Sequence, residues 1–237
     1  MDAPRPQKVV ALHQPVYLPF PGFFQKMARA DEFMFLDFVQ LHRQSWQVRN
    51  RVKTAAGVAW LSVPVFVKGR FGQLIRDTRV VAGNWGRKHW ETLRQSYGAA
   101  PYFRDYSDFF ADTYARPWEW LVELNLHITE GMRGFFGVRT PIIQPPEGAR
   151  FEGAKTDLVI DICRKIGATT YLSSDGEAAY IEPEKFAAAG LEHRYLGWAP
   201  TPYPQLHGPF VPGLSAVDIL FNCGPKSLDA IMGKGIS

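Results

Sequence analysis

The sequence predicts an α/β fold, and three patterns support this. Two apolar runs of strand length, residues 9–12 and 32–36, flank a segment of helix length, as in a β-α-β unit with two parallel strands. A second strand–helix–strand pattern follows at residues 169–196. Between them, residues 45–64 alternate between polar and apolar side chains, which indicates a hairpin. We therefore expect a Rossmann-like parallel or mixed sheet with an inserted β-hairpin and an aromatic-rich helical segment.

The first β-α-β unit places two polar side chains at strand ends. Pro15 cannot donate a ladder hydrogen bond and biases its neighbour towards an extended backbone, so the strand over residues 9–12 should end just before it. A helix is expected over residues 22–30, and the second apolar run ends at Asp37. Because the carboxyl ends of parallel strands meet at one edge of a sheet, we expect His13 and Asp37 to be neighbours there.

The expected hairpin carries charged residues on one side. Asn50 falls on the apolar side, between Val48 and Val52, where a carboxamide needs a partner from the protein or a ligand. The other side forms a basic ribbon of Arg49, Arg51 and Lys53. Of these, Arg51 and Lys53 are expected to be solvated.

Helices are expected between the hairpin and the second half of the sheet. Residues 84–97 read as a helix with Asn84 as its N-cap. Residues 102–136 read as two helices, with Pro117 in the first turn of the second. We expect a single domain over residues 1–237, in which residues of about 84–136 are a helical insertion that packs against the sheet as a lid.

The pattern then returns to alternating helices and strands. Residues 140–153, rich in Pro and Gly, are expected to form a loop. The later elements are a helix over 156–166 with Thr156 as its N-cap, a strand over 169–172 that ends at Ser173, a helix over 183–189, a strand over 191–196 and a last helix that begins at Ser215.

Composition limits the class of protein. The chain has 237 residues, of which 46% are hydrophobic and 21% charged, as in an ordinary globular protein. No apolar run approaches the roughly 18 residues of a membrane span, and the N-terminus lacks the apolar core of a signal peptide, so we expect a cytoplasmic protein. The two cysteines are too few for a disulfide framework. The net charge of +4 suits a small phosphorylated ligand at least as well as nucleic acid.

Seven segments resemble the WbqC-like protein family, in order along nearly the whole chain. They are VALHQPVYLP at 10–19, FLDFVQ at 35–40, WQVRNRVKT at 46–54, WLSVPV at 60–65, GATTYLSS at 167–174, YPQ at 203–205 and LSAVDILFNCG at 214–224. The chain departs from the family pattern at Phe38, where a second acid is usual, and at Ser174, where Gly is usual.

The resemblance implies a transferase. Such proteins resemble accessory enzymes of O-antigen and other surface-polysaccharide biosynthesis, or of specialised natural-product metabolism. The implied reaction moves an acyl or aminoacyl group to an amino sugar or similar amine. The small-molecule substrate would be a nucleotide sugar or a carrier-bound thioester.

Two residues are the candidates for catalysis. We expect His13 to act as general base, because imidazole titrates near the working pH and can take a proton from an attacking amine. Asp37 would orient it or bind a hydroxyl, although a turn cap is the alternative. Gln14 and Gln40 would bind a substrate amide or hydroxyl, or else tie loops together.

Further candidates would bind substrate. Arg49 suits planar recognition of a phosphate or carboxylate, with Asn50 beside it. Other candidates lie in the segments shared with the family: Tyr17, Ser173, Tyr203, Gln205 and Asn222. Cys223 would be a nucleophile if acyl transfer passed through a thioester.

Other polar residues have structural interpretations. The Ser-x-x-acid spacing of Ser215 and Asp218 is that of a capping box. Cys163 and His89 fall on apolar helix faces and are expected in the core. The histidines lack the spacing of metal ligands, and neither a phosphate loop nor a dinucleotide fingerprint occurs, so we expect no metal and no cofactor.

Two alternatives stay open from the sequence. A histidine after the first strand and a Ser-Ser pair after a late strand are loosely similar to nucleotidylyl-transferases. A non-catalytic binding module for a sugar nucleotide or carrier domain is the other alternative. Nucleic-acid binding is the weakest reading, and the oligomeric state is open.

Overall fold

The chain forms two compact units, each assembled from three stretches of sequence. A computed structural model describes residues 6–42 and 44–235. Residues 1–5, which carry part of the argument against a signal peptide, lie outside the described residues. Unit 1 comprises Met1–His13, Gln25–Leu36 and Arg139–Ala199, and unit 2 comprises Gln14–Phe24, Asp37–Val138 and Pro200–Ser237. None of the described helices is long and apolar enough to cross a bilayer.

Among the described residues of unit 1, five strands form a parallel sheet in the order β5-β2-β1-β6-β7. The strands are β1 (Val9–His13), β2 (Glu32–Phe35), β5 (Ile142–Ile143), β6 (Thr170–Ser173) and β7 (Glu192–Tyr195). This confirms a mixed α/β fold with parallel pairing of the first two strands. The prediction of a loop over residues 140–153 is wrong at Ile142–Ile143, which form β5. No sequence signal marked this strand, because two residues are too few for a periodic pattern.

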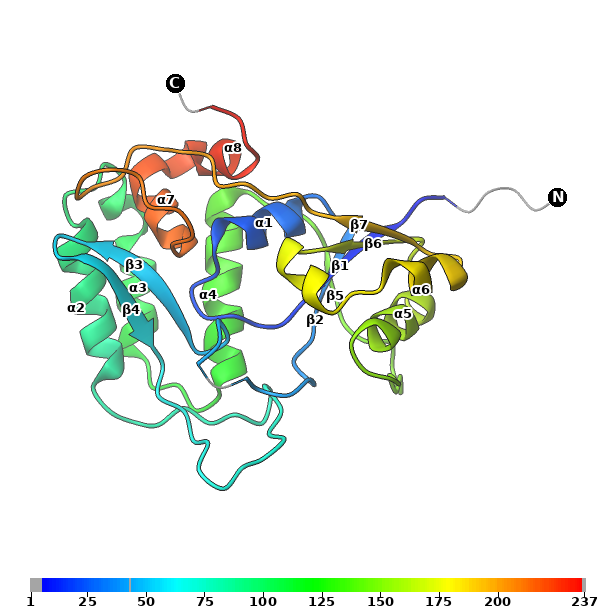
Figure 1. The fold of residues 1–237 in the computed structure, drawn as a ribbon. Coiled ribbons are helices and arrows are strands. Elements are labelled where there is room, and N and C mark those ends of the chain that lie inside the picture. Colours follow the sequence, from blue (N-terminus) through cyan, green and yellow to red (C-terminus); the bar gives the residue numbers. More distant parts are fainter. Residues whose placement is uncertain (1–5, 43, 236–237) are drawn as a thin grey trace. The chain divides into compact units, whose positions relative to one another are not determined.

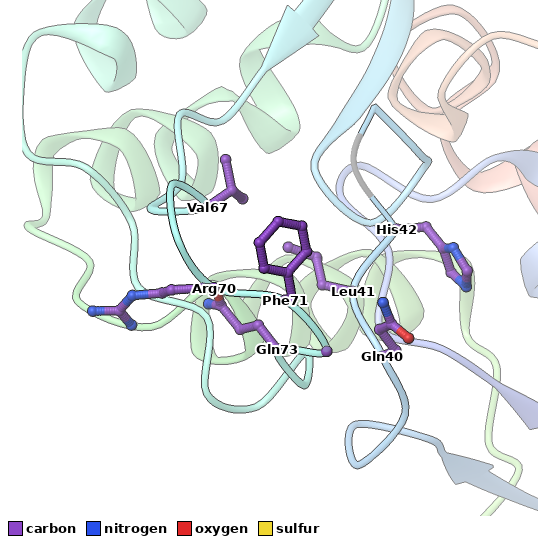
Figure 2. A pocket seen from close by; sticks show the side chains of 8 residues that line it. Gln40, Leu41, His42, Val67, Arg70, Phe71 and Gln73 are labelled. Carbon is purple, nitrogen blue, oxygen red and sulfur yellow. The ribbon is translucent and has the colours of Figure 1, made fainter.

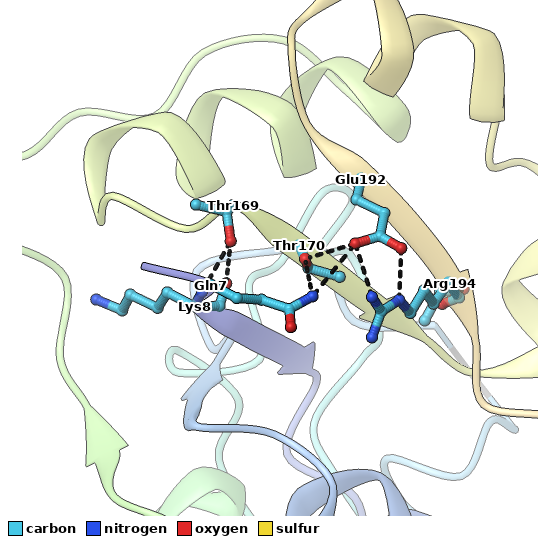
Figure 3. Close-up of polar contacts among 7 residues, drawn as sticks. Gln7, Lys8, Thr169, Thr170, Glu192 and Arg194 are labelled. Carbon is cyan, nitrogen blue, oxygen red and sulfur yellow. Dashed lines mark hydrogen bonds and ion pairs between the residues drawn. The ribbon is translucent and has the colours of Figure 1, made fainter. Parts of the chain in front are cut away.

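Parallel pairing brings polar strand ends to one edge. His13 pairs in register with Phe35 of β2, and Ser173 pairs with Tyr195 of β7. The amino ends of the strands are tied by other polar side chains (Figure 3). There the Thr169 hydroxyl accepts from the Lys8 N–H at 2.7 Å, and the Glu192 carboxylate accepts from the Thr170 hydroxyl at 3.1 Å. The carboxyl edge is therefore the end of the sheet where a ligand site is expected.

Helices α5 (Thr156–Lys165) and α6 (Pro183–Ala188) belong to unit 1, together with the 3-10 turn η1 (Asp175–Ala179). Phe186 of α6 stacks on Tyr171 with ring centroids 5.5 Å apart, and Gly190 closes the helix with a φ of +70° that favours glycine. Thr156 is not the N-cap of α5. Its hydroxyl instead donates to the Tyr180 carbonyl oxygen and accepts from the Glu182 N–H.

Unit 2 joins the hairpin to helices. Strands β3 (Arg49–Thr54) and β4 (Gly57–Ser62) pair antiparallel, as predicted. The hairpin lies beside α2 in Figure 1, and α3 packs against α2. The helices described in this unit are α2 (Trp85–Tyr97), α3 (Phe103–Ala115), α4 (Leu121–Phe136), α7 (Ala216–Cys223), η2 (Gly224–Lys226) and α8 (Ser227–Ile231). Helix α1 (Pro21–Ala28) spans the boundary between the units in sequence.

Two details of unit 2 correct the sequence interpretation. Pro117 lies in the connection between α3 and α4, and not in the first turn of α4, which begins at Leu121. The helix that begins after Ser215 is followed by α8 and is not the last. Whether residues of about 84–136 form an insertion stays a prediction. They share unit 2 with the hairpin and α7, and Phe103 and Phe110 both pack on Phe221 of α7.

The hairpin has a buried and an exposed face. Asn50, Val52 and Leu61 are buried, whereas Trp60 on the other face is 47% exposed. The expectation that Lys53 is solvated is wrong, since this residue is only 3% exposed. Its ammonium donates to the carbonyl oxygens of Gly208 and Pro209, because a loop from the far end of the sequence covers it.

Candidate functional site

The carboxyl edge of the unit 1 sheet holds two of the predicted residues. His13 ends β1 and is half-buried. Ser173 ends β6 and is fully buried, and its hydroxyl oxygen lies 2.8 Å from Nε2 of His193. Burial lowers the pKa of His193 below its ordinary value, which favours the neutral imidazole. The Ser173 hydroxyl is also placed to donate to the Arg194 carbonyl oxygen at 3.4 Å. Sequence spacing gave no sign of His193, because it lies one strand away.

A buried ion pair fixes the segment that follows β6. The ammonium of Lys26 donates to the Leu12 carbonyl oxygen at 2.8 Å and to the Glu177 carboxylate at 2.7 Å. Glu177 also accepts from the Tyr171 hydroxyl and the Ser174 N–H. Burial would raise the pKa of Glu177, but the Lys26 charge and these hydrogen bonds lower it to about 2. The Ser-x-x-Glu spacing that begins at Ser174 was a signal for this arrangement, which is a capping box.

In unit 2, Gln14 belongs to a chain of amides. Its carboxamide oxygen accepts from Nε2 of Gln47, and the Gln47 carboxamide oxygen accepts from the His42 N–H at 2.8 Å. The Asn125 side chain donates to the Gln47 carbonyl oxygen at 2.9 Å. These bonds tie the segment after β1 to the chain before the hairpin and to α4. They agree with the loop-tying alternative for Gln14.

A pocket opens beside His42 (Figure 2). Its volume is about 250 Å³, and it is lined by Gln40, Leu41, His42, Val67, Arg70, Phe71, Gly72 and Gln73. Gln40 was a predicted site residue, and the others were not. Asp37, the proposed partner of His13, lies in the segment that leads to the pocket, where its carbonyl oxygen accepts from the Arg76 N–H. Its catalytic role stays a prediction.

Three predicted residues meet around a buried carboxylate in unit 2. Asp218 accepts from the hydroxyls of Tyr97 and Tyr203 at 2.8 Å each, and from the Asn222 amide at 3.4 Å. Gln205 joins through its carboxamide oxygen, which accepts from the Lys53 ammonium at 3.2 Å. Burial raises the pKa of Asp218 above its ordinary value, against the hydrogen bonds that lower it.

The capping-box interpretation of Asp218 is wrong. Ser215 does cap α7, since its side chain accepts from the Val217 N–H. The Ser215 N–H donates to the Arg51 carbonyl oxygen instead of to the Asp218 carboxylate. The Ser-x-x-acid spacing is compatible both with a capping box and with an acid that accepts hydrogen bonds from other elements. Contacts with residues distant in sequence show that Asp218 has the second role.

Tyr17 and Asn50 make contacts that hold unit 2 together. The Tyr17 hydroxyl lies 2.8 Å from Nδ1 of His89 and also bonds the Tyr114 hydroxyl. The Asn50 side chain donates to the Leu18 carbonyl oxygen at 2.6 Å, which supplies the partner that its position required. His89 is a core residue, as predicted. Substrate contact by Tyr17 or Asn50 stays a prediction.

Arg49 lies on the exposed face of the hairpin. Its guanidinium carbon lies 4.4 Å from the centroid of the Trp60 ring, within the range of a cation–π interaction. Trp46 is also exposed, with its ring centroid 5.6 Å from that of Trp60. Arg49 itself is half-buried, and its binding of a phosphate or carboxylate stays a prediction.

The two cysteines and the possible metal ligands have the following environments in the described residues. Burial raises the pKa of the Cys223 thiol to about 12, with Asp218 as a second cause, which disfavours the thiolate form at neutral pH. The role of Cys223 as a nucleophile stays a prediction. Cys163 is a core residue, as predicted. In the described part of the chain, His, Cys, Asp and Glu residues do not gather in threes that would hold a metal ion.

Comparisons with known proteins identify one family. Residues 14–230 match the WbqC-like protein family. A protein of Mycobacterium tuberculosis described as "Uncharacterized protein Rv1507c" is 33% identical over 224 residues, covering 94% of this chain and 96% of the relative. No solved structure matches significantly.

Proposed function

The chain belongs to the WbqC-like protein family, and from that membership we propose that it transfers an acyl or aminoacyl group to the amine of an amino sugar or a similar molecule. The setting would be surface-polysaccharide or natural-product biosynthesis. The observation that carries the proposal is the position of His13 at the carboxyl end of a central parallel strand, beside a second strand that ends in Ser173. In open α/β sheets this edge is where ligands bind.

His13 is proposed as the general base. Its imidazole takes a proton from the acceptor amine as the nitrogen attacks the carbonyl carbon of the donor. A carbon–nitrogen bond forms, the bond to the leaving group breaks, and the imidazolium returns the proton to that leaving group. The donor would be a carrier-bound thioester or a nucleotide-activated acyl group. The ion pair of Lys26 and Glu177 supports this role by fixing the backbone after β6.

The test is turnover by a His13→Ala variant. An acetyl or aminoacyl pantetheine thioester serves as donor, a nucleotide-linked amino sugar as acceptor, and product is measured by mass spectrometry. Loss of a general base should lower the rate by about 10²- to 10⁴-fold, with an unchanged circular dichroism spectrum. Glu192→Ala, at the amino end of the same sheet, should keep the wild-type rate. Wild-type turnover by His13→Ala would refute the proposal.

A nucleotidylyl-transferase-like activity is the second candidate, and the strand order favours it. Counted in chain order, the sheet reads 3-2-1-4-5, which is the order of Rossmann-like nucleotide-binding sheets without their last strand. Binding of nucleoside triphosphates measured by calorimetry, with release of pyrophosphate, would favour this activity. Binding of a sugar nucleotide without turnover would instead favour a non-catalytic binding module.

A further inference from the structure

The pocket of unit 2 has the side chains of a sugar-binding site. Four of its eight lining residues end in planar groups that exchange hydrogen bonds with hydroxyls: Gln40, His42, Arg70 and Gln73. Phe71 adds an aromatic ring that is 93% exposed. Aromatic faces of this kind pack against the C–H face of a sugar ring.

An unsatisfied acceptor is the second observation. The Gln73 carboxamide oxygen is buried and has no hydrogen-bond partner among the described residues, whereas its Nε2 donates to the Asp77 carbonyl oxygen at 3.1 Å. A buried acceptor without a donor costs about 1–3 kcal/mol. The terminal torsion of a glutamine is soft, so a ligand hydroxyl can satisfy this oxygen after a small rotation of the carboxamide.

Size and charge narrow the class of ligand. A volume of about 250 Å³ lies below the roughly 300 Å³ at which sites for drug-sized ligands begin, and so suits a single ring. Arg70 contributes a guanidinium, and none of the eight lining residues is acidic. A carboxylate is therefore favoured over an ammonium group, because a guanidinium binds a carboxylate through two parallel hydrogen bonds.

We propose that this pocket binds a monosaccharide that carries a carboxylate. Phe71 stacks on the ring, Arg70 binds the carboxylate, and Gln73 accepts a hydroxyl proton. The inference goes beyond the proposed transfer reaction, because recognition of this sugar depends only on residues that line the pocket and requires no step of that reaction. It holds whether or not His13 is catalytic.

Three related sugars test the ligand class. Glucuronate, glucose and glucosamine have similar rings and carry negative, zero and positive charge. Binding to the full chain is followed by NMR titration without an acyl donor. Glucuronate should bind about three- to tenfold more tightly than glucose, and glucosamine most weakly. Absence of glucuronate binding at tens of millimolar, or equal affinity for the three sugars, would overturn the proposal.

Matched variants in the same loop locate the binding site. Phe71→Ala and Arg70→Ala should each weaken glucuronate binding at least threefold. Phe66→Ala and Lys68→Ala alter exposed residues that do not line the pocket and should bind like the wild type. Wild-type affinity in both Phe71→Ala and Arg70→Ala would place any binding elsewhere and contradict the proposal.

A variant that gains affinity for one sugar separates a specific effect on binding from a loss of structure in the loop. Gln73→Glu keeps the size of the side chain and places a negative charge in the pocket. It should weaken glucuronate binding and raise the affinity for glucosamine above that of the wild type. A misfolded loop cannot produce that gain, and a Gln73→Glu variant that keeps the wild-type preference would overturn the assignment. Transfer assays with His13→Ala report separately on the proposed function.

Discussion

The buried imidazole of His89 shows how one side chain makes stability depend on pH. It packs among aromatic rings and lies within hydrogen-bond distance of the Tyr17 hydroxyl. Burial lowers its pKa to about 4, against a backbone contact to Ser62 that raises it. In the unfolded chain the pKa of a histidine is about 6.5. Between these values the unfolded chain binds more protons, so stability falls as the pH falls.

We predict that His89→Gln flattens this part of the pH profile. Protonation of His89 should lower the unfolding free energy of the wild type by about 3 kcal/mol between pH 7 and pH 4. The His89→Gln variant should not show this decrease, because glutamine does not titrate. Urea unfolding at several pH values measures the difference. Tyr17→Phe removes the hydrogen bond and keeps the titrating group, so it should lower stability and retain the slope. Equal slopes for His89→Gln and the wild type would contradict the prediction.

At the scale of elements, the Asp218 side chain links α7 to the rest of unit 2. Its carboxylate accepts from the hydroxyls of Tyr97 in α2 and of Tyr203 in the preceding loop. Two tyrosine hydroxyls depend on Asp218, and each loses a buried acceptor if it is removed. The cap itself is the side chain of Ser215. The two residues should therefore differ in their energetic importance.

We predict that Asp218→Ala costs at least about 3 kcal/mol of unfolding free energy, since it leaves two buried donors without acceptors. Ser215→Ala should cost about 1 kcal/mol, as the loss of an N-cap does. Chemical denaturation of both variants under one set of conditions gives the comparison. If the cost of Asp218→Ala were no greater than that of Ser215→Ala, the network would lack the importance assigned to it.

At the scale of the whole molecule, each unit is built from three separate stretches of chain. The sheet of unit 1 takes β1 and β2 from the first sixth of the sequence and the other strands from beyond residue 138. Its order is therefore set by contacts of long sequence separation. Strand β1 lies between β2 and β6, whereas β5 is an edge strand of two residues.

We predict that hydrogen exchange in unit 1 follows this order. Amides of β1 should exchange much more slowly than those of β5, because β1 is hydrogen-bonded on both sides and its middle residues are fully buried. Those of β5 should exchange fastest among the strands. Mass spectrometry after deuterium labelling of the intact chain measures this, and equal protection of β1 and β5 would contradict it.

The sequence by itself determined the elements whose signals are local. Residues 9–12 and 32–36 are apolar runs bounded by breakers, and the hairpin repeats with a period of two, so strand pairing followed from pattern and connection rules. The position of His13 at a strand end followed in the same way. Family membership was likewise readable from ordered motifs along the chain.

Tertiary structure decided what the polar side chains do. Lys53 became a buried donor because a loop more than 150 residues later covers it, and Asp218 became an acceptor because two tyrosines converge on it. The ion pair of Lys26 and Glu177 also joins residues that no spacing rule connects. The same holds for the pocket, which brings Gln40 together with Phe71. Periodicity reports which face of an element is apolar, but the partner of a buried polar group is fixed only when distant segments pack together.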